Sequence, residues 1–347
     1  MAQHAKRLPL PAVTAVLFTC AGQRVDIISA FGRAGATTVA VDASPLAPAL
    51  YHAHHHSLVC RLDDPRYVSQ LRAVVDEFDV KLVVPLADMD QELLSRRRDE
   101  LAPALVLLPE TDVVRAMADK FSAHELFLAQ HIGSPDTWLP DDLPDEIPFP
   151  VLVKARVGYG SRNIYRCRER AELDFHLART PVPSMVQVEC RGEEFSIDVF
   201  CDFDGTCLNA IPRTMIESKG GESIKGTTIA DPELIDLGRR VAEALPLAGP
   251  ANVQCFREPD GRLLVTDVNP RFGGGFPLPL AAGSEYPALA IALANRERPE
   301  PRVGDFRAGV VMTRFFSDLC LAPGLDGTLA PLDEELPDAI APEPAEA

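Results

Sequence analysis

Apolar runs alternate with amphipathic segments over residues 12–108. The apolar runs at 13–19, 37–41, 81–85 and 105–108 have the length of buried strands. The segments at 23–32, 67–78 and 88–101 have helical spacing, and Asp88 stands where the third would be capped. Strands that alternate with helices pair in parallel through right-handed crossovers. The pattern therefore predicts an α/β, Rossmann-like domain over residues 12–110.

The pattern changes after residue 110. Two helices are expected at 111–120 and 122–131, and a proline- and acid-rich connector follows at 138–149. Strands and hairpins dominate 151–269, where one helix is expected to begin with Asp231 as its N-cap and Pro232 at its first position. This region is predicted to be α+β. The last 17 residues carry six acids and no Lys or Arg, so we expect an acidic, disordered tail at 321–347.

Composition narrows the function classes. Lys+Arg 34 against Asp+Glu 51 gives a net charge of −17, which disfavours nucleic-acid and membrane-surface partners. The stretch between Lys6-Arg7 and Cys20 has features of a lipoprotein signal, but prolines 9 and 11 interrupt it, so a buried strand is the favoured interpretation. The eight cysteines form no C-x-x-C pair, which indicates free thiols in a reducing compartment, and a cytoplasmic location is expected.

Two features of the first domain suggest a ligand site, but the residues that usually accompany such a site are missing. Asp42 ends the second apolar run, where dinucleotide-binding folds place a ribose-binding acid, but the glycine fingerprint is missing from the first turn. We therefore expect no nicotinamide site. His52, His54, His55 and His56 suggest a metal site, yet no carboxylate or cysteine pattern accompanies them, and a solvated loop is expected.

The segments 252–257 and 262–269 are predicted to form a hairpin around the turn at 258–261. Because side chains alternate along a strand, Asp267 and Asn269 share one face. A connecting loop of two or four residues places Gln254 on that face opposite Asp267, whereas an odd loop does not. Three oxygen donors suit Mg²⁺, with Mn²⁺ as an alternative, and Arg271 follows where it can meet a phosphoryl group. The alternative is a plain edge hairpin with a polar face.

A second cluster begins where the apolar strand 151–154 ends in Lys154. The loop that follows contains Gly158, Gly160 and Ser161. A fixed cation beside backbone N–H groups is what nucleotide phosphates require, although no Walker A sequence occurs. Only six of the 34 basic residues are lysine, which makes a lysine on an apolar strand notable. The alternative is a lysine that reaches the surface beside a glycine turn.

A third element is an apolar strand at 185–189, a turn containing Gly192 and a second strand to 199. We expect a hairpin whose first strand offers backbone groups to an adenine edge, with Glu194 near a ribose. An ordinary hairpin is the alternative.

Taken in order, these pieces resemble the ATP-grasp superfamily over about residues 12–300, and the carbamoyl-phosphate-synthetase-like branch resembles them most. The most specific match is the string Asp-Val-Asn-Pro-Arg-Phe-Gly-Gly-Gly at 267–275. The resemblance implies a pre-ATP-grasp domain at 12–110, a small subdomain at 111–186 and a large subdomain with the metal site at 187–320. It also implies that ATP and Mg²⁺ are the cofactors.

The resemblance implies roles for individual residues. The ATP-binding set is Lys120, Lys154, Gly158, Gly160, Ser161, Gln187, Val188, Glu189, Cys190 and Glu194. The metal set is Gln254, Asp267 and Asn269, although many relatives have glutamate in place of Asp267. Arg271 is expected to be catalytic, as is Lys225 on a mobile lid at 213–228, for which a solvated loop is the alternative.

The activity implied by the resemblance is ATP-dependent carboxylate–amine ligation through an acyl phosphate. The partners would be a small-molecule carboxylate and amine, with no nucleic acid and no membrane, in a homodimer by analogy. Two alternatives stay open: a carbamoyl-phosphate-synthase-like protein that phosphorylates bicarbonate or carbamate, and a degenerate ATP-binding regulatory module. The chain has a single ATP-grasp unit, which weighs against complete carbamoyl phosphate synthesis.

Overall fold

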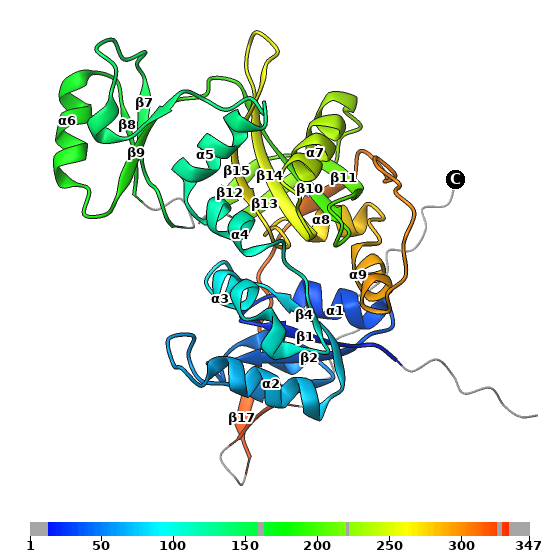
Figure 1. Cartoon of the computed structure of the whole chain (residues 1–347). Helices are drawn as coiled ribbons and strands as arrows, with labels where there is room; N and C mark the ends of the chain where they lie inside the picture. Colours follow the sequence, from blue (N-terminus) through cyan, green and yellow to red (C-terminus); the bar gives the residue numbers. More distant parts are fainter. Residues whose placement is uncertain (1–12, 159–162, 220–221, 325–327, 333–347) are drawn as a thin grey trace, which may run out of the picture.

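The first domain is a five-stranded parallel sheet in the order β3-β2-β1-β4-β5 (Figure 1). The computed structural model describes residues 13–158, 163–219, 222–324 and 328–332. The strands are β1 Ala15–Thr19, β2 Thr37–Asp42, β3 His55–Leu58, β4 Val80–Pro85 and β5 Leu105–Val106. The main helices are α1 Val25–Arg33, α2 Tyr67–Glu77 and α3 Gln91–Arg96. The predicted Rossmann-like layer is confirmed, and β1 is buried along its whole length.

Two expectations for this domain are wrong. His55 and His56 begin the edge strand β3 instead of lying in a loop, and the Nδ1 atom of His54 accepts a hydrogen bond from the amide of Thr38 at 3.1 Å. Asp88 caps no helix, because α3 begins at Gln91, and a single 3₁₀ turn at Arg98–Leu101 replaces its expected second half.

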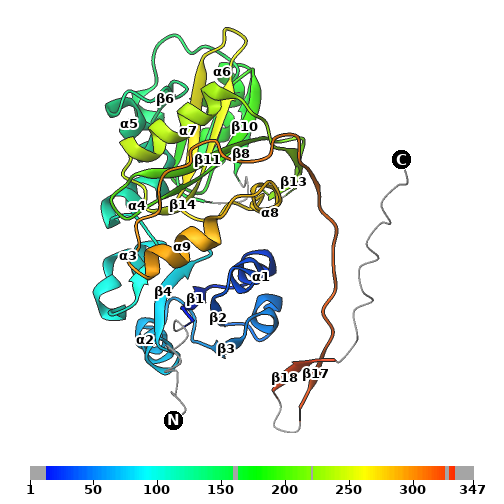
Figure 2. The ribbon, with the colours of Figure 1, turned by 90° about the vertical axis from the view of Figure 1, so that its right-hand side faces the viewer.

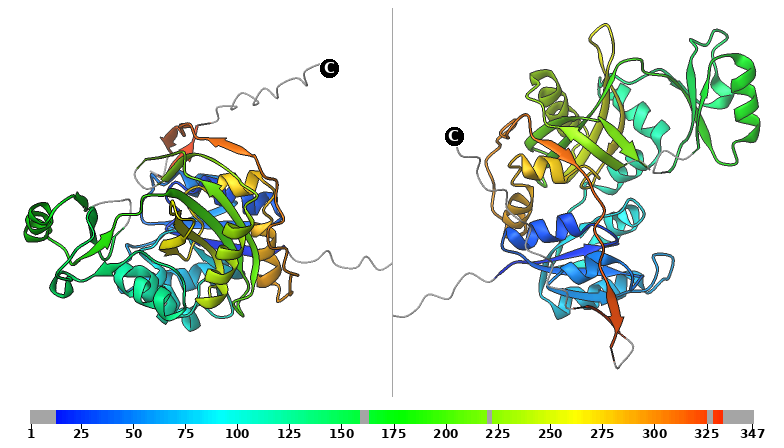
Figure 3. Two further views of the ribbon diagram at one scale, coloured as in Figure 1. Left: turned by 90° about the horizontal axis from the view of Figure 1, so that it is seen from above. Right: turned by 180° about the vertical axis from the view of Figure 1, so that it is seen from behind.

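A second, smaller sheet has the order β6-β9-β7-β8 and projects to one side of the molecule (Figure 3). Its strands are β6 Thr137–Trp138, β7 Val151–Ala155, β8 Ile164–Cys167 and β9 Ser184–Val188. The helix α6 Arg170–Arg179 covers one face through Leu173. This helix contradicts the expectation of one helix in 151–269. Its sequence buries only that one side chain, so no apolar stripe marks it.

The third sheet is antiparallel, in the order β11-β10-β14-β15. Its strands are β10 Glu193–Cys201, β11 Cys207–Thr214, β14 Gly249–Arg257 and β15 Leu263–Asn269. The helices α4 Thr111–Ala118, α5 Lys120–Ala129 and α7 Pro232–Ala244 cover its apolar face. Helix α7 has the predicted cap, since Asp231 accepts hydrogen bonds from the amides of Glu233 and Leu234. The combination of a parallel layer and an antiparallel α+β region confirms the fold class.

The expected hairpin between residues 185 and 199 is wrong, because β9 and β10 belong to different sheets. The chain leaves the second sheet after Val188 and enters the third sheet at Glu193. At Gly192 a Cβ atom would lie 1.7 Å from the carbonyl oxygen of Arg257, so this crossing leaves room for glycine alone.

The remaining elements join the domains and extend beyond them. Helices α8 Pro277–Ala281 and α9 Tyr286–Ala294 pack on the first domain through a shared core. A three-stranded sheet contains β12 Glu217–Lys219, β13 Glu222–Thr227 and β16 Val311–Thr313. The chain then runs outward to a hairpin of β17 Leu321–Pro323 and β18 Leu329–Pro331 (Figure 2). The two strands of this hairpin correct the tail prediction for 321–323 and 329–331, and residues 325–327 and 333–347 lie outside the described residues.

Candidate functional site

One face of the third sheet is polar where four strands lie side by side. Ser196 of β10 lies opposite Gln254 of β14, which in turn lies opposite Asp267 of β15. Asn252 and Asn269 form the next pair on the same face. Residues directly opposite each other share a face, so the polar side chains gather there while the reverse face packs on α4, α5 and α7.

The pairing of Gln254 with Asp267 depends on a β-bulge. Arg257 pairs with Leu263, so the loop at 258–262 has an odd length, which by itself would turn Gln254 away from Asp267. The register shifts by one between Gln254 and Cys255 and restores the pairing. The expectation that only an even loop gives this arrangement is therefore wrong, while the arrangement itself is present.

Two lysines meet this face. The Nζ atom of Lys120, at the start of α5, lies 2.7 Å from the Oδ2 atom of Asp267. The Nζ atom of Lys154, on β7, donates to the Oε1 atom of Gln187 at 2.8 Å. Burial, and then the positive charge of Lys120, lower the pKa of Lys154, while Asp267 and Glu194 act in the opposite direction. The structure therefore brings the ammonium groups of Lys120 and Lys154 close to the carboxylates of Asp267 and Glu194.

The residues expected to hold the adenine are partly engaged already. The amide of Val188 donates to the carbonyl of Asp136 at 2.9 Å, and that of Glu189 to the carbonyl of Pro150 at 3.1 Å. The Glu189 carboxylate pairs with Arg166.

The remaining residues of that set keep distinct chemistry. Within the described ranges the amide of Cys190 has no hydrogen-bond partner, so it is the amide left for a base edge. Burial raises the pKa of the Cys190 thiol to about 12, which keeps it neutral. Burial also raises the pKa of Glu194. Gln187 is 2% exposed and donates to Thr137 at 2.9 Å, so it holds Lys154 in place and is closed to solvent.

Arg271 ties the end of β15 to the first domain. Its guanidinium donates to both carboxylate oxygens of Asp88, at 2.6 and 3.2 Å, and to the Oδ1 atom of Asn269 at 3.4 Å. Arg24 donates to the carbonyls of Phe272 and Gly273, both at 3.1 Å. Arg24 and Asp88, which follow β1 and β4, are not among the site residues predicted from the sequence. The signal that could have identified both residues is their position after the carboxyl ends of parallel strands, where ligand sites commonly lie.

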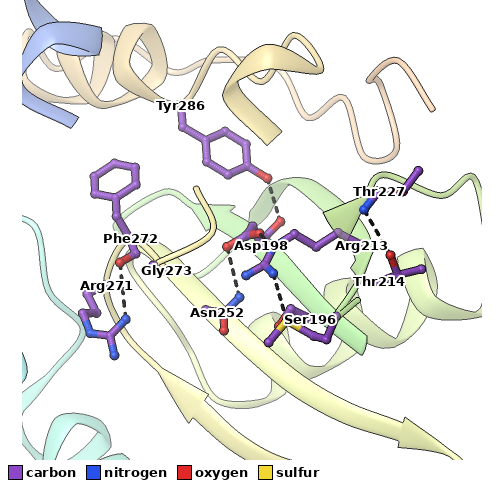
Figure 4. A network of polar contacts seen from close by, with 12 residues as sticks. Ser196, Asp198, Arg213, Thr214, Thr227, Asn252, Arg271, Phe272, Gly273 and Tyr286 are labelled. Carbon is purple, nitrogen blue, oxygen red and sulfur yellow. Dashed lines mark hydrogen bonds and ion pairs between the residues drawn. The ribbon is translucent and has the colours of Figure 1, made fainter. Parts of the chain in front are cut away.

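A buried ion pair supports the glycine segment that follows Arg271 (Figure 4). The Nε atom of Arg213 on β11 donates to the Oδ2 atom of Asp198 at 2.8 Å, and both side chains are almost fully buried. The Nδ2 atom of Asn252 donates to the other oxygen of Asp198 at 3.0 Å. A Cβ atom at Gly273 would lie 2.8 Å from Asp198, and one at Gly275 would lie 2.5 Å from the Arg213 guanidinium carbon. Close packing therefore requires both glycines.

The remaining predicted residues lie elsewhere or outside the description. Lys225 is on β13 within a small sheet, so the alternative of a solvated loop is wrong at this residue, while its role on a lid stays a prediction. Its Nζ atom lies 2.6 Å from the Oε2 atom of Glu217, and no contact joins it to Lys154 in the part of the chain that the structure describes. Gly158 lies at φ +152° in open space. Gly160 and Ser161 fall outside the described residues.

The donor set fits Mg²⁺ in the presence of a nucleotide. Among the described residues, no group of three or more His, Cys, Asp or Glu side chains is placed to hold a metal. Gln254, Asp267 and Asn269 supply one carboxylate and amide oxygens instead. Mg²⁺ is commonly bound by one or two carboxylates together with phosphate oxygens and water, so such a sparse protein set is suitable.

Two family models match different parts of the chain. Residues 16–120 match the model of the PylC-like N-terminal domain. Residues 180–315 match that of ATP-grasp in the biosynthetic pathway with Ter operon. Residues 180–315 are thus similar to an ATP-grasp domain. This match agrees with the ATP-dependent ligase chemistry expected from the sequence. In the described ranges no helix is long and apolar enough to span a bilayer.

Solved structures share the fold at low identity. The biotin carboxylase domain of Hydrogenobacter thermophilus 2-oxoglutarate carboxylase, in complex with MgADP, ADP and bicarbonate, is 18% identical, with a TM-score of 0.69 over 85% of this chain and 73% of that chain. The L-amino acid ligase of Bacillus licheniformis is 17% identical, with a TM-score of 0.65 over 85% and 77%. Rhizobium etli pyruvate carboxylase is 16% identical, with a TM-score of 0.69 over 86% of this chain, which spans only 30% of that much longer one.

Proposed function

We propose that this chain is an ATP-dependent carboxylate–amine ligase that acts through an acyl phosphate. The observation that carries the proposal is the convergence of Lys120 and Lys154 on the face that holds Gln254 and Asp267. Two cations opposite a divalent-metal donor set match the charge of a nucleoside triphosphate. A structural relative is named as an L-amino acid ligase, which is consistent with this class of reaction.

Lys120 and Lys154 would bind the α- and β-phosphates. Lys120 is paired with Asp267 here, so nucleotide binding would exchange that contact for a phosphate and free the carboxylate. Gln254, Asp267 and Asn269 would hold Mg²⁺, which when bound neutralises phosphate charge. Catalysis would then consist mainly of positioning and electrostatic stabilisation.

The segment 273–275 is suited to hold the substrate carboxylate. Its carbonyls face arginines, since Arg24 binds that of Gly273 and Arg314 binds that of Gly274. The amides of the three glycines have no hydrogen-bond partner within the described residues. Successive free N–H groups form an anion-binding nest.

In the first step, a carboxylate oxygen held by this nest would attack the γ-phosphorus, and ADP would leave. Arg271, one residue from the nest, would stabilise the charge on the transferred group. In the second step, an amine would attack the acyl carbon and lose a proton, and phosphate would leave.

The test is product analysis on the purified chain with MgATP and pairs of candidate acids and amines. ADP and phosphate formed only when both an acid and an amine are present would support the ligase. Turnover that requires bicarbonate alone would support the carbamoyl-phosphate-synthase-like alternative. Tight ATP binding without turnover on any pair would indicate the regulatory module.

Assembly and location belong to the same proposal. All eight cysteines are free, which supports a reducing compartment such as the cytoplasm.

On the segment that runs outward after β16, Phe315 and Phe316 are 83% and 93% exposed. Adjacent exposed phenylalanines are unusual on a monomer surface and would be covered by a second copy in a homodimer.

A further inference from the structure

A cavity of about 470 Å³ lies at the carboxyl ends of the first-domain strands. Residues that follow β1, β2, β3 and β4 all contribute to it, together with the first residue of α2. The lining is Cys20, Gly22, Asp42, Ala43, Val59, Cys60, Arg61, Leu62, Asp63, Tyr67, Ala87 and Met89. Cavities of this size hold small ligands, and this edge of a parallel sheet is where they bind.

The cavity is next to the proposed catalytic centre. Ala87 and Met89 line it, and Asp88 between them binds Arg271, which in turn contacts Asn269 of the metal set. On the other side Gly22 lines it, and Arg24 two residues later binds the carbonyls of the glycine segment. Residues that line the cavity are therefore sequence neighbours of Asp88 and Arg24, whose hydrogen bonds join the first domain to the segment after β15.

The cavity has apolar walls and one carboxylate without a basic partner. Asp42 accepts hydrogen bonds from the amides of Gly22, at 2.9 Å, and Ser44, at 2.8 Å, which fix its orientation. No ion pair in the described ranges involves Asp42. Arg61, the one cation in the lining, lies 3.6 Å from Asp63, and both are largely exposed at the rim. The net charge favours a cation or hydrogen-bond donor and disfavours a phosphorylated ligand.

The floor of the cavity is closed by its own hydrogen bonds. The hydroxyl of Tyr67 donates to the Oδ2 atom of the fully buried Asp90 at 3.3 Å, and the hydroxyl of Thr19 donates to the same oxygen at 2.6 Å. The Cys20 sulfur lies 3.7 Å from the Tyr67 hydroxyl. Burial raises the pKa of Cys20 far above its ordinary value, so the thiol stays neutral. The floor therefore contributes a rigid surface and leaves Asp42 as the recognising group.

We propose that this cavity binds the amine acceptor of the ligation, and that the acceptor is a primary amine with a short apolar body and no phosphate. The inference rests on the proposed function and adds the chemical class of the second substrate. The apolar part would lie among Val59, Leu62 and Met89, and the amine would donate to Asp42.

The experiment measures binding to the nucleotide-free full chain by titration calorimetry and saturation-transfer NMR. The probes are isoamylamine, O-phosphoethanolamine and adenosine. We expect isoamylamine to bind the wild type, with about a tenfold loss of affinity in Asp42→Asn and no detectable binding in Ala87→Leu, which fills the cavity. The matched controls Asp63→Asn, on the rim, and Ala288→Leu, which lines a separate cavity beside α1, should bind within twofold of the wild type.

Equal isoamylamine affinity in wild type and Asp42→Asn would overturn the proposal, as would no binding to the wild type. Tighter binding of O-phosphoethanolamine or adenosine, lost in Ala87→Leu, would overturn the assignment to an amine. Circular dichroism shows whether each variant is folded. Because no ATP is present, amine binding without ligation in the product assay would reject the proposed function and not the cavity assignment.

Discussion

Gly275→Ala tests whether the buried ion pair supports the glycine segment. The added Cβ atom would lie 2.5 Å from the Cζ atom of Arg213 and 2.7 Å from each terminal nitrogen. Non-bonded carbon atoms rest at about 3.5–4.0 Å, so one partner must move by about 1 Å. Arg213 is fully enclosed and holds Asp198 at 2.8 Å.

The cost follows from what moves. If the backbone shifts, overpacking a core costs about 1–3 kcal/mol. If Arg213 is displaced, Asp198 becomes a buried carboxylate without its partner, and breaking such a pair costs about 3–5 kcal/mol. We therefore expect Gly275→Ala to lower the free energy of unfolding by about 3 kcal/mol, close to the overlap of these two ranges.

Urea unfolding followed by circular dichroism measures the change. Gly32→Ala is the matched control, because its Cβ atom would make an ordinary 3.5 Å contact inside a helix, where alanine is favoured. Arg213→Lys removes the crowded guanidinium, so the double variant should lose less stability than the sum of the single variants. A Gly275→Ala protein as stable as the Gly32→Ala protein, or strict additivity in the double variant, would refute the steric argument.

Three further outcomes are expected. Asp267→Ala should abolish MgATP turnover while circular dichroism shows a folded chain, and wild-type turnover would contradict the metal assignment. Burial and Lys120 lower the pKa of Lys154, so the affinity for MgADP, measured by calorimetry, should fall as pH rises through that lowered pKa and the ammonium is lost. Lys154→Met should bind MgADP more weakly at neutral pH, and its affinity should depend less on pH. An unchanged pH dependence in this variant would contradict the phosphate-binding role of Lys154. If the wild type is a dimer, Phe316→Ser should lower its sedimentation coefficient toward that of the monomer. A coefficient equal to that of the dimeric wild type would contradict the proposed interface.

The elements that could be predicted from the sequence are those with strong local patterns. The strands of the first domain are continuous apolar runs, and the cap at Asp231 with Pro232 marks α7 without tertiary information. Helix α6 lacks an apolar stripe and was missed. The hairpin predicted between β9 and β10 is wrong because two strands separated by a glycine turn form a hairpin only if nothing else pairs with them. A neighbouring backbone at Gly192 decides otherwise.

The hairpin of β14 and β15, which carries the proposed metal ligands, shows a second limit of prediction from local sequence patterns. Alternation along the strand predicts that Asp267 and Asn269 share a face, as observed, but it predicts neither the odd loop nor the bulge. Either of these alone would turn Gln254 to the reverse face. Gln254 still lies opposite Asp267 because the odd loop and the bulge compensate each other. Register in a strand pair is set by packing on both faces, which a local pattern does not contain.

The contacts made by Arg271 could not have been predicted from its own segment. Its expected partner is a phosphate, and its observed partner is Asp88, 183 residues away in sequence. A guanidinium that pairs with a carboxylate in the first domain and touches Asn269 links the proposed metal site to the wall of the proposed amine cavity. If a phosphoryl group competes for that guanidinium, Asp88 is released and the wall formed by Ala87 and Met89 loses its tether. Acceptor binding and phosphoryl transfer then become coupled through a single side chain, which gives the two half-reactions a physical reason to occur in order.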